Sequence, residues 1–92
     1  MSDFLTQLMT IIEDRKLNPK AGSYTNTLLD DPIRAAQKVG EEATEVVVAA
    51  LAQSNQRLVA EMADLVYHSL VLLAAHDLSW TDVVAELERR HK

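Results

Sequence analysis

Apolar residues recur at helical spacing in four segments of this chain, and each segment predicts a helix. The first two begin in the N-terminal half. One covers about residues 4–16, with Ser2 as its predicted N-cap. It ends before Pro19, because proline disfavours a helical conformation in the residue that precedes it. The next covers about residues 33–53 and opens with the Asp31-Pro32 pair, a cap followed by proline at the first helical position.

The other two segments follow closely. The pattern predicts a helix over about residues 56–76 and a last one over 79–90, where Ser79 begins a capping box. Only residues 54 and 55 separate the second and third helices, so these two should pack as an antiparallel hairpin. The sequence therefore predicts an all-α fold, a bundle of about four helices per chain.

A polar stretch at residues 19–31 interrupts the pattern. It contains one glycine and four hydroxyl residues, and its periodicity is weak, so we expect a loop with at most a short helical turn at 27–29. Loops of this length in a compact domain usually carry a function or are disordered.

Like charges crowd the second helix at "KVGEEATE", residues 38–45. At 100° per residue, Glu41, Glu42 and Glu45 share one stripe with Arg34 and Lys38. The opposite face is apolar and contains Val39, Ala43, Val46, Val47 and Ala50.

The third helix repeats this arrangement. Glu61, Asp64 and His68 share a stripe beside an apolar face made of Leu58, Met62, Leu65, Val66 and Leu73. In an antiparallel hairpin the acidic pairs of the two helices stand at similar heights. Carboxylates gathered in this way repel one another unless a proton or a cation lies among them. Oxygen ligands favour Mg²⁺, Mn²⁺ or Ca²⁺, whereas an isolated acidic pair on a helix is usually just solvated.

Apolar residues near the carboxylates, namely Val48, Leu51, Leu70 and Val71, indicate that a second molecule covers this surface. Gly40 lies inside the same predicted helix, where glycine costs about 1 kcal/mol relative to alanine. We expect either a close approach to its backbone or a helix contact.

Composition narrows the function classes. The 92 residues suit one domain (1–92), and without cysteine there is no disulfide framework or thiolate metal site. The apolar runs predict no membrane span, and the N-terminus does not resemble a signal peptide, so we expect a soluble cytoplasmic protein. A net charge of −5 argues against general nucleic-acid binding, although five of the nine basic residues precede the acidic cluster: Arg15, Lys16, Lys20, Arg34 and Lys38.

Four stretches carry a family resemblance: "SYTNTLL" (23–29), "KVGEEATEVVVAA" (38–50), "EMADLVYHSLVLL" (61–73) and "VVAELERRH" (83–91). Together they resemble the phosphoribosyl-ATP pyrophosphatases of histidine biosynthesis, within the wider MazG-like all-α nucleotide pyrophosphatases. The resemblance implies Mg²⁺-dependent hydrolysis of the α,β-phosphoanhydride of phosphoribosyl-ATP to phosphoribosyl-AMP and pyrophosphate. It also implies a stand-alone enzyme whose bundle is completed by homodimerisation.

The same resemblance assigns roles to single residues. The implied metal ligands are Glu42, Glu45, Glu61 and Asp64. Glu41 is implied as ligand of a second Mg²⁺, as general base or as a structural partner of Lys38. Lys38 and Arg34 would stabilise the departing pyrophosphate. The implied contacts to phosphate or ribose are Ser23, Tyr24, Thr25 and, more weakly, Lys20, while His68 is expected to be a hydrogen-bonded packing residue rather than a ligand.

Three alternatives stay open at this stage. A house-cleaning pyrophosphatase acting on free nucleoside triphosphates would use the same four carboxylates, and the "GSYT" loop favours the biosynthetic substrate instead. A ferritin-like di-iron bundle would need Glu-x-x-His on two helices, and the sequence does not carry this motif on two helices. A non-catalytic helical dimerisation module would bind no Mg²⁺.

Overall fold

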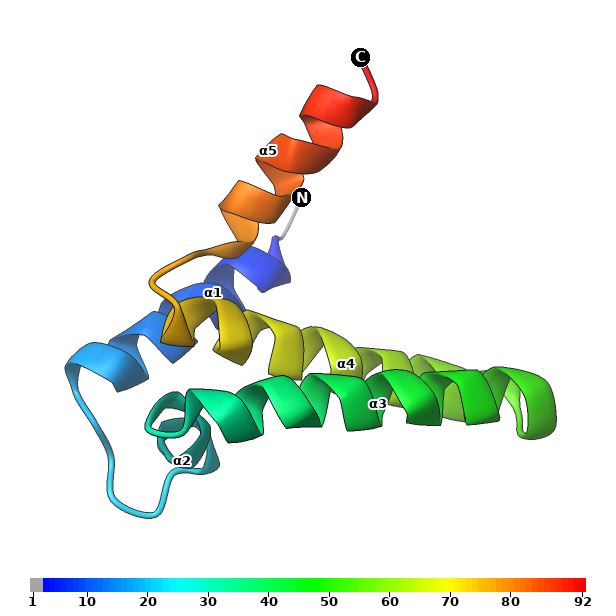
Figure 1. The fold of residues 1–92 in the computed structure, drawn as a ribbon, viewed down its shortest axis with the longest axis horizontal. Coiled ribbons are helices and arrows are strands. Elements are labelled where there is room, and N and C mark those ends of the chain that lie inside the picture. The colour runs from blue at the N-terminus through cyan, green and yellow to red at the C-terminus, as the bar shows by residue number, and fades with distance from the viewer. Residues whose placement is uncertain (1–2) are drawn as a thin grey trace.

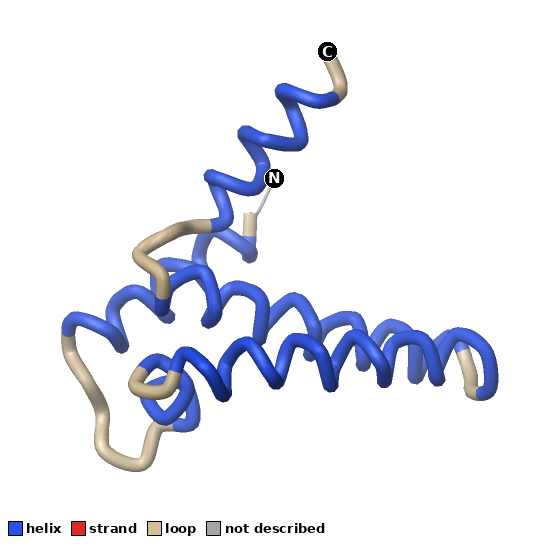
Figure 2. The backbone as a smooth tube through the Cα atoms, viewed as in Figure 1, coloured by secondary structure: helices blue, strands red, loops and turns tan. Residues whose placement is uncertain are grey.

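The computed structural model describes residues 3–92, which form helices and no strand (Figure 2). The all-α prediction is confirmed. Figure 1 shows two long antiparallel helices side by side, with the shorter helices gathered at one end of the pair. The described helices are α1 Phe4–Leu17, α2 Tyr24–Leu29, α3 Pro32–Ala52, α4 Asn55–Ala75 and α5 Trp80–Arg90.

Side-chain caps set the helix starts. The predicted cap of the first helix, Ser2, lies outside the described residues, and Asp3 caps α1 by accepting a hydrogen bond from the Thr6 amide at 3.2 Å. Ser54 caps α4 in the same way, so this helix begins one residue before the predicted start. The capping box at Ser79 is present as predicted.

Helix α2 lies in the stretch predicted as a loop with at most a helical turn at residues 27–29, so that prediction is wrong for residues 24–26. Polar groups hold this helix, which is why apolar periodicity missed it. The Asn26 side chain is buried, donates to the Arg15 carbonyl at 2.8 Å and accepts from the Lys20 amide at 2.9 Å. Leu28 is fully buried and fixes the other end of the helix.

The core lies where α1 and α2 pack against the α3–α4 hairpin, and we call this end of the hairpin its base. The opposite end, around the turn at residues 53–54, is the tip. Helices α1, α2 and α4 supply most of the core, with one alanine from α3. The core residues are Met9, Ile12, Leu28, Ala35, Leu70, Val71 and Ala74.

The apolar patch expected to meet a second molecule divides between base and tip. Leu70 and Val71 are fully buried in the chain's own core, which corrects the expectation that a partner covers them. The reason is that α1 and α2 pack against the base of α4. The sequence pattern does not report how these two segments pack. Val48 and Leu51 lie toward the tip and are 46% and 83% exposed.

Helix α4 is long and apolar enough to cross a membrane by length and composition, with a mean hydropathy of 1.6 over its best window. The sequence pattern had predicted no such span. The core helix of a soluble protein passes the same test. Here Leu70, Val71 and Ala74 of α4 are buried in the core, which accounts for the apolar residues at the base of the helix, although only 28% of the apolar window is buried.

Candidate active site

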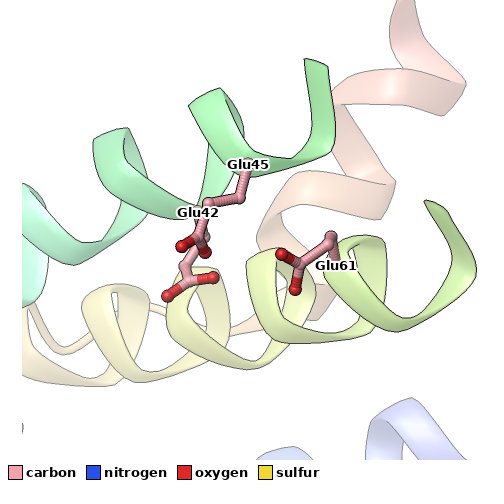
Figure 3. A group of neighbouring side chains, drawn as sticks. All are labelled: Glu42, Glu45 and Glu61. Atoms are coloured by element: carbon pink, nitrogen blue, oxygen red, sulfur yellow. The ribbon is translucent and has the colours of Figure 1, made fainter. Parts of the chain in front are cut away.

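Three carboxylates meet between the long helices: Glu42 and Glu45 of α3 and Glu61 of α4 (Figure 3). One side-chain oxygen from each lies within 4.8 Å of the others. Glu42 and Glu61 are buried, with 6% and 9% of their surface exposed, whereas Glu45 is exposed. We call these three residues the carboxylate cluster.

The helix faces that meet in the hairpin carry Glu42 and Glu61, so the acidic stripes face each other in part, as expected from the sequence. The buried residues of α3 are Ala35, Glu42 and Ala49, seven residues apart, and on α4 Glu61 and His68 have the same spacing. A spacing of seven returns to one side of a helix. Small alanines on this side of α3 flank the buried Glu42, which faces α4.

The expected apolar faces are accordingly left partly open. Val47 of α3 is 55% exposed and Met62 of α4 is 43% exposed. The cause is that a short hairpin turn lets each helix bury only one side against the other, and that side is centred on Glu42 in α3 and on Glu61 and His68 in α4.

A basic residue stands one turn before each buried glutamate. Lys38 Nζ is 3.3 Å from Glu42 Oε1 and 3.5 Å from Glu41 Oε1. The Glu42 side chain, followed by the charge of Glu41, raises the pKa of Lys38. Arg57 Nη2 lies 3.4 Å from Glu61 Oε2. The sequence interpretation missed Arg57, although its i, i+4 spacing to Glu61 repeats that of Lys38 to Glu42.

The carboxylate cluster is short of positive charge. Hydrogen bonding with Glu42 raises the pKa of Glu45, while the same bond, and then Lys38, lower the pKa of Glu42. A proton on Glu45 is therefore shared with Glu42. Glu42 Oε2 is buried without a hydrogen-bond partner among residues 3–92. Such an atom is costly unless a donor or a cation reaches it.

The other acidic and basic residues predicted for the site are not members of the carboxylate cluster. Asp64 is exposed and is not in the carboxylate cluster. The Glu41 side chain is 62% exposed and contacts Lys38. Arg34 and Lys20 are exposed, and neither forms an ion pair within residues 3–92.

The residues predicted from the "GSYT" stretch lie at the start of α2, beside α4. The Tyr24 hydroxyl lies 2.9 Å from His68 Nε2, and the Thr25 hydroxyl is hydrogen bonded to the Tyr67 hydroxyl. Ser23 accepts from the Asn26 amide and caps α2. His68 is buried and hydrogen bonded, as expected for a packing residue.

The fold and the site define a class. Side chains on facing helices of a bundle form a carboxylate site in its interior, an arrangement that helical bundles use to hold metal ions. This chain belongs to the phosphoribosyl-ATP pyrophosphohydrolase family, which it matches over residues 5–91. The family resemblance inferred from the motifs is confirmed.

Curated relatives agree with this assignment. The phosphoribosyl-ATP pyrophosphatase of Sulfurisphaera tokodaii is 49% identical over 99% of this chain and 98% of that protein. The enzyme of the same name from Methanocella arvoryzae is 42% identical over the full length of both. A histidine biosynthesis bifunctional protein HisIE from Caldanaerobacter subterraneus is 46% identical over 98% of this chain, which spans 44% of that protein.

Proposed function

We propose that this chain hydrolyses the α,β-phosphoanhydride of phosphoribosyl-ATP, giving phosphoribosyl-AMP and pyrophosphate in the histidine pathway of the cytoplasm. Family membership over residues 5–91 and the names of full-length relatives support the substrate. The observation that carries the chemistry is the carboxylate cluster, with a buried Glu42 oxygen that has no hydrogen-bond partner among residues 3–92.

The residues present fit a divalent cation with oxygen ligands. In the proposal Glu42, Glu45 and Glu61 hold Mg²⁺, and Asp64, one turn after Glu61, completes the set. Carboxylate oxygens at this spacing suit Mg²⁺ or Mn²⁺ better than zinc. A bound Mg²⁺ would neutralise phosphate charge and lower the pKa of water at the site.

Two cations of the chain are proposed to bind the phosphates. Lys38 precedes Glu42 by one turn on α3, and Arg57 precedes Glu61 by one turn on the antiparallel α4. They therefore stand on opposite sides of the carboxylate cluster along the hairpin, Lys38 toward the base and Arg57 toward the tip. Lys38, together with Arg34 one turn closer to the base, would stabilise charge on the departing pyrophosphate. Glu41 is proposed to orient Lys38 for this role.

A second copy of the chain is proposed to cover the tip. Large apolar side chains are exposed there, including Val47, Val48, Leu51, Val59 and Met62. They continue into a groove of about 580 Å³ between α1 and α4 that is lined by Phe4, Leu5, Leu8, Leu58, Val59, Met62, Ala63, Val66 and Tyr67. Exposed apolar surface of this extent marks an interaction site, and a chain of 92 residues buries only a modest core alone.

The test is pyrophosphate release with Mg²⁺ from phosphoribosyl-ATP, measured beside ordinary nucleoside triphosphates under the same conditions. The proposal predicts rapid turnover of phosphoribosyl-ATP alone, abolished by a chelator. Comparable turnover of free triphosphates would assign the chain to house-cleaning chemistry. No turnover of any substrate, together with no heat of Mg²⁺ binding by calorimetry, would leave only the dimerisation module.

A further inference from the structure

Two neighbouring residues at the start of α2 are hydrogen bonded to two neighbouring residues of α4. Tyr24 pairs with His68 at 2.9 Å, and Thr25 pairs with Tyr67. The rings of Tyr24 and His68 meet edge to face, with centroids 5.8 Å apart. His68 is 7% exposed and Tyr24 is 46% exposed. A buried ring on the hairpin thus holds a tyrosine that still faces outward.

Backbone chemistry fixes the direction of the Tyr24–His68 hydrogen bond. His68 Nδ1 lies 2.7 Å from the Asp64 carbonyl oxygen, which can only accept. Nδ1 therefore carries the proton, and in the neutral ring Nε2 is left as an acceptor. The Tyr24 hydroxyl must donate its only proton to Nε2. Its oxygen keeps lone pairs for an incoming group but has no proton left to give.

This tyrosine stands beside the carboxylate cluster, on the side of the base. His68 follows Glu61 by seven residues on the buried side of α4, toward the base, and Tyr24 is hydrogen bonded to it. Both members of the pair are therefore near the groups proposed to handle the phosphates.

Helix α2 does not depend on this hydrogen bond for its position. Asn26 is buried with two side-chain hydrogen bonds to the backbone, and Leu28 is fully buried in the core. The bond to His68 instead orients the Tyr24 hydroxyl. It also makes this hydroxyl a donor to His68 and an acceptor toward any other group.

We propose that His68 is a positioning residue that makes Tyr24 a hydrogen-bond acceptor for a sugar hydroxyl of the nucleotide substrate. A phosphate oxygen also only accepts, so it finds no donor at this hydroxyl, whereas a ribose hydroxyl can donate to it. In this proposal Tyr24 accepts a hydrogen bond from the ribose and not from a phosphate. This narrows the expectation from the sequence that Tyr24 contacts phosphate or ribose. The inference rests on the proposed function for its substrate.

The functional test compares KM and kcat for phosphoribosyl-ATP in Tyr24→Phe, His68→Phe and the double variant. One neutral hydrogen bond is worth about 0.5–1.5 kcal/mol, so each single variant should raise KM by about twofold to thirteenfold with kcat nearly unchanged. The double variant should lose no more than either single variant, because the two residues act as one unit. His68→Gln, whose amide oxygen can accept from Tyr24, should restore part of the loss.

Ser69→Ala is the matched control. Ser69 is the next residue on α4 and makes the same kind of bond to the carbonyl four residues before it, to Leu65 at 2.8 Å. This variant should leave KM unchanged. Additive losses in the double variant, or a fall in kcat and thermal midpoint with KM unchanged, would overturn the positioning role.

A second readout does not depend on turnover. The ¹⁵N NMR shifts of His68 distinguish the two neutral tautomers, and the inference requires the proton on Nδ1 in the wild type. A proton on Nε2 would overturn the inference, because Tyr24 would then be free to donate. Absence of turnover of phosphoribosyl-ATP by the wild type, with the expected tautomer present, would instead contradict the proposed function and remove the sugar assigned to Tyr24.

Discussion

The two ends of the α3–α4 hairpin have similarly apolar sequences and opposite fates. At the base, Leu70 and Val71 are fully buried beneath α1 and α2. At the tip, Leu51 and Val59 are 83% and 70% exposed, although they belong to the same two helices. The difference shows that burial here is decided by which helices arrive from elsewhere in the chain and not by the apolar content of the hairpin.

The carboxylate cluster lies between these two ends. The base gives it a fixed framework, because the helices that carry Glu42 and Glu61 are held there by the core. Glu45 leaves the carboxylate cluster open toward solvent on one side, because this side chain is exposed. A site of this kind can hold a cation on rigid helices and still admit a large nucleotide.

The largest effect, on the free energy of unfolding, should appear when the same leucine-to-alanine substitution is made at the base and at the tip. Leu70→Ala removes a fully buried side chain, and we expect it to lower the free energy of unfolding by about 2–5 kcal/mol. Leu51→Ala should lower it by less than about 0.5 kcal/mol in dilute protein. Urea denaturation at low and high protein concentration measures both. The comparison would fail if Leu51→Ala cost as much as Leu70→Ala in a sample shown by light scattering to be monomeric.

Next in size is the loss of one buried carboxylate. Glu42→Gln keeps the shape of the side chain but removes the charge, and we expect phosphoribosyl-ATP hydrolysis to fall by at least about 100-fold. Loss of a group that only hydrogen bonds to a metal ligand lowers metal affinity or activity by about 10- to 100-fold. Loss of a ligand itself should cost at least the upper end of that range. Steady-state rates at saturating Mg²⁺ test this. The exposed carboxylate Glu13 on α1 provides the control, since Glu13→Gln should retain wild-type rates.

A smaller effect concerns pH. Because Glu42 raises the pKa of Glu45, a proton competes with the cation at a pH above the ordinary glutamate range. Mg²⁺ affinity should be full at high pH and should fall as the pH drops through the raised pKa of Glu45. Calorimetric titration across pH measures it. Glu45→Gln should bind more weakly with a flatter pH dependence, and an affinity that rises on acidification would contradict this account.

The smallest effect concerns Gly40, where the expected helix contact is not found within residues 3–92. A Cβ built at Gly40 would meet nothing within 4 Å among the described residues. Gly40→Ala should therefore raise the free energy of unfolding by about 0.5–1 kcal/mol through helix propensity. Thermal denaturation of the dilute protein measures this change. If Gly40→Ala also abolished activity, a substrate or a partner chain would have to approach this backbone.

Local chemistry made much of the fold predictable. The pairs Asp31-Pro32 and Ser79 with Asp82 marked helix starts that the structure contains, and helical period located all four longer helices. Periodicity reports which residues share a face, however, and does not report what covers that face. It therefore assigned Leu70 and Val71 to a partner, because nothing local reveals that α1 and α2 fold back over them.

The sequence predicted the carboxylates of the candidate site but missed the helix beside them. Equal heights above a short turn brought Glu42, Glu45 and Glu61 together, as the spacing predicted. Helix α2 was missed because a buried Asn26 holds it by hydrogen bonds, which leave no hydrophobic period. The Tyr24–His68 bond joins residues 44 positions apart, and only the three-dimensional fold reveals it.

The carboxylate cluster between α3 and α4 is the proposed binding site of the divalent cation. Anomalous diffraction from crystals grown with Mn²⁺, which prefers the same oxygen ligands as Mg²⁺, tests this proposal most directly. We predict one strong peak within bonding distance of Glu42, Glu45 and Glu61, and its disappearance in Glu42→Gln. A peak bound elsewhere, or no peak at Mn²⁺ concentrations that support hydrolysis, would contradict the proposal.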